Sequence, residues 1–101
     1  MTEVYIAYSG NASMRFERGY YSREHLPLVE RHWGKYGLLR LAALYPDDAN
    51  SGILAICVCT FRDDEAASAS FASPEAAEVM ADIKNFTDVS PSQSRAVPLS
   101  K

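Results

Sequence analysis

The sequence lacks any apolar run long enough to span a bilayer. Its first ten residues, MTEVYIAYSG, also lack the basic start and apolar core of a signal peptide. Clusters of lysine and arginine are missing, and the formal net charge is −3, which argues against nucleic acid as a partner. We therefore expect a cytoplasmic protein that binds neither membranes nor nucleic acid.

Cysteine is scarce, and the motifs of common cofactor sites are missing. The only two cysteines, Cys57 and Cys59, are one residue apart, so on a strand both would point to the same face. We expect two free, buried thiols rather than a disulfide or a metal site. There is no glycine-rich phosphate loop, Ser-His-Asp set or paired-cysteine zinc spacing, so we expect no cofactor and no metal.

The length of 101 residues, with 48% hydrophobic and 23% charged residues, fits a single folded domain over residues 1–101. Apolar, β-prone runs predict strands over residues 3–9, 38–45 and 53–61 and within 94–99. Helical spacing predicts one helix from about Met14 to Gly34 or Gly37. Later helices should begin at Asp63 and at Ser73-Pro74, as caps and first-turn proline indicate.

This β-α-β-β-α-β order predicts an α+β protein with the ferredoxin-like fold, a four-stranded antiparallel sheet with both helices on one face. The third strand, ILAICVCTF, is apolar on both faces, whereas a strand with one solvated face should alternate. Two helices can cover only one face of the sheet. We therefore expect a homodimer in which a second copy covers the other face.

The segment YYSREHLPLVERHWGKYG, residues 20–37, has helical spacing but contains Pro27. A proline removes one backbone hydrogen bond and clashes with the carbonyl four residues earlier, that of Arg23. We expect a kink or restart near residues 24–26 that directs His25 into a cleft. An imidazole with apolar neighbours would stay neutral near pH 7 and could accept and return a proton.

Other interpretations of these side chains stay open. A histidine on a helix is often a surface or partly buried residue with one hydrogen bond, and His32, seven residues later, would share the stripe of His25. Asp82, Asn85 and Phe86 would share one side of a helix. They could form a polar helix end with a buried phenylalanine, or they could orient a ligand or His25.

Two segments resemble the EthD family, named for a protein of ethyl tert-butyl ether degradation. YYSREHLPLVERHWGKYGLL carries the family's paired aromatic residues, its His-x-Pro-Leu motif and a Trp-Gly-x-Tyr-Gly-Leu stretch, and SPEAAEVMADIKNFTDVSP resembles its Ser-Pro-Glu…Asp-Ile-x-Asn-Phe segment. The resemblance implies the dimeric α/β-barrel version of the fold, with a small cleft between helices and sheet. It also implies that His25 projects into this cleft.

With this resemblance we expect His25 to be catalytic and five residues to contact the substrate: Tyr21, Trp33, Asp82, Asn85 and Phe86. Relatives of the fold include cofactor-free monooxygenases, lactone isomerases and polyketide cyclases or dehydratases. One hypothesis is therefore an enzyme that moves a proton on a small apolar aromatic, lactone or polyketide-like metabolite. The alternatives are a non-catalytic binding or accessory protein for a partner oxidoreductase in a degradation pathway, and a purely structural dimer.

Overall fold

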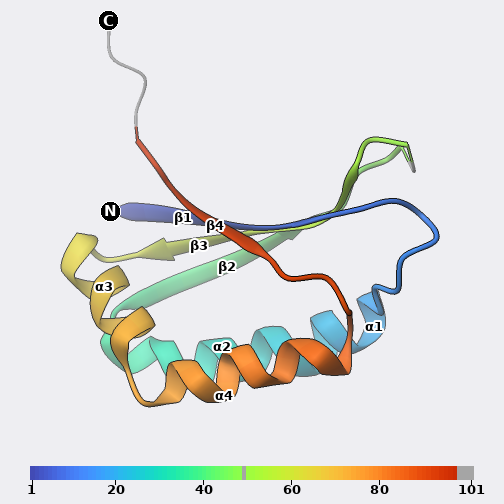
Figure 1. Cartoon of the computed structure of the whole chain (residues 1–101). Coiled ribbons are helices and arrows are strands. Elements are labelled where there is room, and N and C mark those ends of the chain that lie inside the picture. The colour runs from blue at the N-terminus through green and yellow to red at the C-terminus, as the bar shows by residue number, and fades with distance from the viewer. Residues whose placement is uncertain (49, 98–101) are drawn as a thin grey trace, which may run out of the picture.

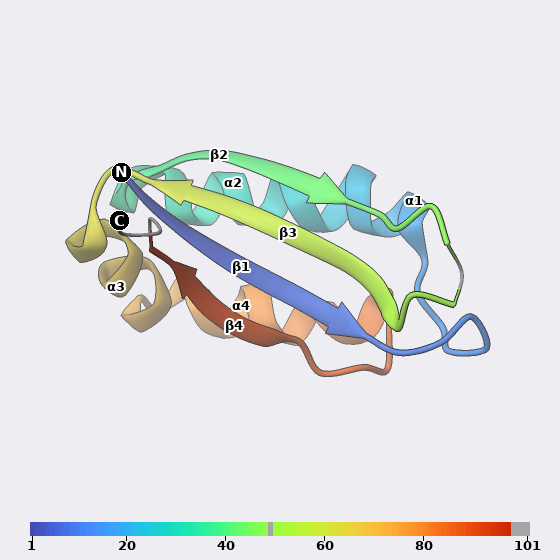
Figure 2. The same ribbon diagram turned by 90° about the horizontal axis from the view of Figure 1, so that it is seen from above.

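The computed structural model of the chain describes residues 1–48 and 50–97, which form a four-stranded antiparallel sheet with the helices on one side (Figure 1). The strand order is β2-β3-β1-β4, as seen from above in Figure 2. The predicted ferredoxin-like fold is thus confirmed. The elements are β1 (Thr2–Ser9), α1 (Arg18–Tyr20), η1 (Tyr21–His25), α2 (Leu26–Trp33), η2 (Gly34–Tyr36), β2 (Leu38–Leu44), β3 (Ile53–Phe61), α3 (Asp64–Ala72), α4 (Glu75–Asp82), η3 (Ile83–Asn85) and β4 (Ser92–Ala96).

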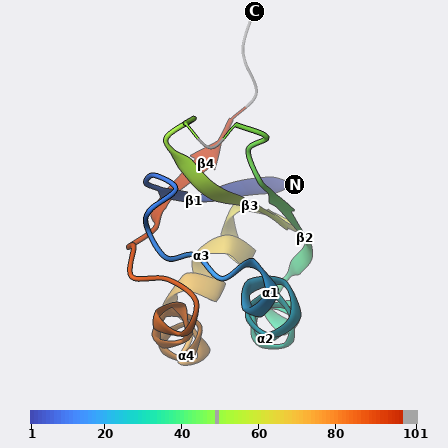
Figure 3. The same ribbon diagram turned by 90° about the vertical axis from the view of Figure 1, so that its right-hand side faces the viewer.

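The core lies between the sheet and the two long helical segments, which run side by side beneath it (Figure 3). Strands β1 and β3 pair Val4 with Cys59 and Tyr8 with Ala55, and residues directly opposite each other share a face of the sheet. All four of these side chains are buried against the helices. Both thiols are free, as expected, and Cys57 and Cys59 project to the same side with their sulfur atoms 3.8 Å apart.

Pro27 does not break its helix. Residues 21–25 form a π-helical turn, in which the N–H of Leu26 donates to the carbonyl of Tyr21, and right-handed helical backbone continues through it into α2. The expected kink is therefore replaced by a wider turn, which accommodates a residue that has no N–H to donate. Gly37, with φ of +113°, ends the helical run as predicted, because glycine adopts this conformation without strain.

The observed ends of three other helices and strands are compared here with the predicted ends. The first helix begins at Arg18 rather than near Met14. Asp63 caps α3 through a bond from the N–H of Ala66, as expected, but the Ser73 hydroxyl donates back to the carbonyl of Ser70 and does not cap α4. The last strand spans residues 92–96, and residues 98 and 99 of the predicted strand lie outside the described residues.

The face of the sheet turned away from the helices is apolar at its centre. The register places Tyr5 of β1 beside Val58 of β3, and Ile56 of β3 beside Leu44 of β2. Tyr5 and Leu44 are 42% and 55% exposed, while Ile56 and Val58 are half-buried. None of the helices in residues 1–48 and 50–97 has the length and apolarity needed to cross a membrane.

Candidate functional site

The candidate site is built around a buried histidine–aspartate pair that joins the π-helical turn before α2 to the end of α4. His25 ends the π-helical turn and is only 4% exposed. Its Nδ1 lies 2.9 Å from Oδ2 of Asp82, the last residue of α4. An ionised carboxylate can only accept a hydrogen bond, so Nδ1 carries the proton and Nε2 of the neutral ring has a free lone pair.

Asp82 is held by more than the histidine. The hydroxyl of Tyr20 donates to its Oδ1 at 2.7 Å, and Nδ2 of Asn85 donates to the same oxygen at 2.9 Å. Burial alone would raise the pKa of Asp82, but the hydrogen bonds from Tyr20, His25 and Asn85 outweigh it and hold the pKa below its usual value. The carboxylate therefore stays ionised at neutral pH and fixes the tautomer of His25.

Burial lowers the pKa of His25 below its ordinary value of 6.5, against the opposing effect of Asp82. The ring is neutral at pH 7, as the sequence suggested. Tyr21 stacks on it with ring centres 5.7 Å apart, and Phe86 packs against it at 4.6 Å. Two aromatic side chains thus pack against the imidazole, and its Nε2 has no hydrogen-bond partner within the described part of the chain.

His25 lines an inner cavity between the sheet and helices α2 and α4. The cavity has a volume of about 70 Å³. Its walls are mostly apolar, with a few hydroxyl, thiol and amide groups. The lining residues are Ile6, Tyr8, Tyr21, His25, Leu26, Val29, Trp33, Cys57, Cys59, Val79, Met80, Ile83, Pro91 and Gln93.

A larger hollow, here called the mouth groove, adjoins the inner cavity. This groove has a volume of about 390 Å³ and is lined by Met80, Ile83, Lys84, Thr87, Asp88, Val89, Ser90 and Pro91. Met80, Ile83 and Pro91 line both spaces, so the two meet between α4 and the segment that leads into β4.

The polar groups of the inner cavity are suited to meeting ligand oxygen atoms. Burial raises the pKa of both Tyr8 and Tyr21, so both phenols keep their protons and can donate hydrogen bonds. The bond with Cys57 and burial together raise the pKa of Cys59, which remains a thiol. Trp33 is 2% exposed, and its Nε1–H has no acceptor in the described part of the chain.

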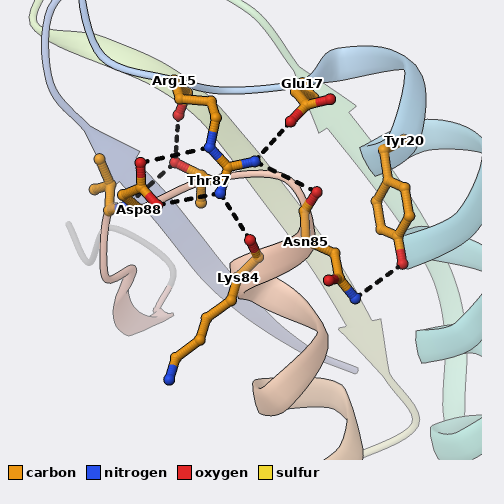
Figure 4. Close-up of polar contacts among 8 residues, drawn as sticks. Arg15, Glu17, Tyr20, Lys84, Asn85, Thr87 and Asp88 are labelled. Carbon is orange, nitrogen blue, oxygen red and sulfur yellow. Dashed lines mark hydrogen bonds and ion pairs between the residues drawn. The ribbon is translucent and has the colours of Figure 1, made fainter.

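A polar cluster centred on Arg15, here called the Arg15 clasp, fixes the end of α4 that carries Asp82 (Figure 4). The guanidinium donates to the carbonyls of Lys84 and Asn85 and pairs with Asp88, and Thr87 donates to the carbonyl of Arg15. A cation at the C-terminal end of a helix satisfies carbonyls that lack partners within the helix. The clasp thereby holds Asn85 where it can support Asp82.

The expected site residues fall into three groups. His25, Tyr21 and Trp33 line the inner cavity. Asp82 and Asn85 do not line it but support His25 from behind, as one of the hypotheses suggested for them. Phe86 is fully buried and lies outside the cavity lining, so its predicted contact with substrate is not seen in this geometry; it packs against the rings of His25 and Tyr21.

Sequence analysis missed Tyr20 as a partner of Asp82, and it missed Tyr8, Gln93 and the two thiols as cavity residues. Adjacent helical positions differ by about 100°, so the sequence did indicate that Tyr20 and Tyr21 point in different directions and have different contacts. His32 does share the stripe of His25, but it binds Glu78 at the surface. Within residues 1–48 and 50–97 no group of three or more potential ligands could hold a metal ion.

The sequence was compared with the models of known protein families. Residues 13–90 match the EthD domain. The chain belongs to the EthD family. Comparison with curated proteins gave no match.

Solved structures share the fold of this EthD protein. An EthD-like protein from Ralstonia eutropha matches with a TM-score of 0.80 at 23% identity, over 94% of this chain and 88% of that one. An ethyl tert-butyl ether degradation family protein from Bacillus halodurans matches with a TM-score of 0.74 at 14% identity, over 98% and 99%. SnoaB from Streptomyces nogalater, a cofactor-independent oxygenase, matches with a TM-score of 0.56 at 10% identity, over 99% and 93%.

The lowered pKa of His25 predicts a pH dependence of stability. Below pH 6.5 His25 is protonated in the unfolded chain, whereas in the folded chain it stays neutral until the pH reaches its lower pKa. Because the unfolded chain binds more protons in this range, the free energy of unfolding should fall as the pH falls from 6.5 to the folded pKa. Chemical unfolding measured between pH 7.5 and 5 would show this loss, and His25→Gln should remove it.

The imidazole resonances supply an independent check. NMR titration should give His25 a pKa below 6.5, and Asp82→Asn should lower it further because the ring loses its carboxylate partner. A His32→Gln variant leaves a single histidine signal and so assigns it. A pKa for His25 above 6.5 would contradict the buried neutral ring.

Proposed function

We propose that this EthD protein is an enzyme that moves a proton on a small, largely apolar metabolite bound in the inner cavity, with His25 as the general base and acid. One observation carries the proposal. The pair formed by Nδ1 of His25 and Asp82 leaves Nε2 unprotonated on a ring that lines a mostly apolar cavity. A base with a free lone pair, held in a fixed orientation, is what proton transfer requires.

The chemical step follows from the groups present. Nε2 removes a proton from a weakly acidic carbon or phenol of the substrate, and the negative charge moves onto a substrate oxygen. The protonated phenols of Tyr8 and Tyr21 can donate hydrogen bonds to that oxygen. The proton on Nε2 then returns to another substrate atom in an isomerisation, or to a departing hydroxyl group in a dehydration, which releases water.

The same deprotonated substrate also suits a third outcome, in which it reacts directly with molecular oxygen. The fold shared with SnoaB, described as a cofactor-independent oxygenase, supports keeping this outcome among the candidates. All three reactions begin with the same proton transfer to His25. They differ in the later step, in which the substrate anion is protonated, loses a hydroxyl group or reacts with oxygen. A test of the first proton transfer therefore applies to all three reactions.

A second candidate is a non-catalytic protein that binds a metabolite for a partner oxidoreductase. The observation in its favour is that the lining of the cavity is mostly apolar and holds a single histidine, which a binding protein could use as well as an enzyme. A carrier needs the apolar cavity but makes no use of the lone pair on Nε2. The two candidates are separated by whether the bound molecule exchanges protons with solvent.

Hydrogen exchange in heavy water tests the proposal without knowledge of the final product. The protein is incubated in D₂O with phenols, unsaturated lactones and 1,3-diketones, and deuterium uptake at carbon is followed by NMR. Catalysed uptake in at least one compound supports proton transfer. Binding without any catalysed uptake across the panel would favour the carrier.

We also propose that two copies pair through the outer face of the sheet, where Tyr5, Leu44, Ile56 and Val58 are otherwise left to solvent. Light scattering should show a dimer at micromolar concentration. Val58→Glu places a charge at the centre of this face and should give a folded monomer. Ala81→Glu on the exposed side of α4 is the control and should remain dimeric. A monomeric wild type would refute the pairing.

A further inference from the structure

We propose that the natural ligand is an amphipathic anion, with an apolar part in the inner cavity and a carboxylate or similar acidic group bound by Lys84 in the mouth groove. The inference rests on the proposed function, because it assumes that the ligand reaches His25. It adds the chemical class of the ligand and a residue that selects it.

The size of the inner cavity sets the first constraint. At about 70 Å³ it offers roughly half the volume of a cavity that accepts benzene, which is about 150 Å³. A metabolite of ordinary size therefore cannot be enclosed there completely. On this inference its remainder extends past Met80, Ile83 and Pro91 into the adjoining mouth groove, which is larger at about 390 Å³.

Charge in the mouth groove sets the second constraint. Only Lys84 and Asp88 among its lining residues carry a charge. Asp88 accepts from both Nε and Nη2 of Arg15, and Arg15 also pairs with Glu17, so Asp88 is held by a cation that it shares. Lys84 uses only its backbone carbonyl in the Arg15 clasp, and Figure 4 shows its side chain directed away from the clasp.

The ammonium group of Lys84 has no carboxylate within 4.0 Å in the described part of the chain. Among the lining residues Lys84 is therefore the cation available to a ligand, and the lining also includes the exposed hydroxyl-bearing residue Ser90. A ligand that leaves the apolar cavity through this groove passes that charge. An acidic group at the outer end of the ligand gains an ion pair there, whereas a neutral group gains none.

Octanoate and octanamide are a matched pair for testing this inference, since they have the same chain and number of heavy atoms but differ in charge. Trp33 is the only tryptophan of the chain and lines the inner cavity, so its fluorescence can report binding of either probe. Octanoate should bind wild type up to about fivefold more tightly at low salt, as expected for one exposed ion pair. Added salt should reduce the preference.

Lys84→Gln should remove the preference and Lys84→Glu should reverse it, while octanamide binding stays within twofold of wild type. Lys35→Gln is the matched control, because Lys35 pairs with Glu75 and lies outside both hollows. Equal binding of the two probes to wild type would overturn the anionic ligand and leave the proton-transfer proposal standing. Failure of both probes to bind wild type, including through burial of the groove in a dimer, would overturn the inference as well.

Discussion

Exchanging His25 for glutamine should lower catalysed hydrogen exchange, or turnover of the true substrate, by about 10²- to 10⁴-fold. Glutamine keeps a polar side chain of similar reach but cannot take up a proton at neutral pH. The effect should fall on the rate constant more than on binding, because the walls of the inner cavity remain. Deuterium uptake at fixed, saturating substrate gives the measurement.

Three controls make the result specific to the site. His32→Gln removes the other histidine, which binds Glu78 outside the cavity, and should leave the rate within twofold. Asp82→Asn should give an intermediate loss, because His25 stays in place but its tautomer is no longer fixed. Circular dichroism confirms that each variant is folded. A His25→Gln enzyme with full activity would exclude His25 as the acid–base group.

Replacing Phe86 by alanine should destabilise the protein by about 3 to 5 kcal/mol, the usual cost of emptying a buried aromatic position. Phe86 is fully buried and packs against Tyr8, Phe16, Tyr21 and His25. Chemical unfolding at a single protein concentration measures the change, and the concentration is held constant because the protein is proposed to dimerise.

Leu39→Ala serves as the matched surface control, since Leu39 is 55% exposed, and should cost no more than about 0.5 kcal/mol. The outcome also separates two roles for Phe86. A substrate contact would weaken ligand binding and leave stability nearly unchanged, whereas a core residue does the reverse. If Phe86→Ala lowered the free energy of unfolding no more than the control does, the result would favour the substrate contact that the sequence suggested for Phe86.

Local signals predicted the elements of the fold well. The apolar run of β3, the Asp63 cap and the left-handed Gly37 each depend on neighbours within a few residues, which the sequence displays directly. The π-helical turn was not predictable in the same way. Proline in a helix excludes the ordinary hydrogen bond, but a break and a wider turn satisfy that constraint equally.

The candidate site was predictable only in part, because its central contact is distant in sequence. His25 and Asp82 are separated by 57 positions, so no local spacing indicates that they meet. The resemblance to the EthD family indicated that both segments contribute to the site. It did not indicate that Asp82 binds His25 outside the cavity whereas Tyr21 lines the cavity. Strand alternation placed the two thiols on the same face of their strand. It gave no sign of where packing on that face leaves a cavity.

Because His25 and Asp82 lie far apart in the sequence, the site forms late during synthesis of the chain. At about 5 to 20 residues per second, the 57 positions between them take a ribosome roughly 3 to 11 seconds to translate. Until α4 emerges, the imidazole has no carboxylate partner, no Phe86 against its ring, and no closed layer to exclude water. Its lowered pKa and fixed tautomer are therefore acquired late, when the last third of the chain docks onto the first. A nascent chain stalled before Asp82 would carry this histidine as an ordinary, solvated base.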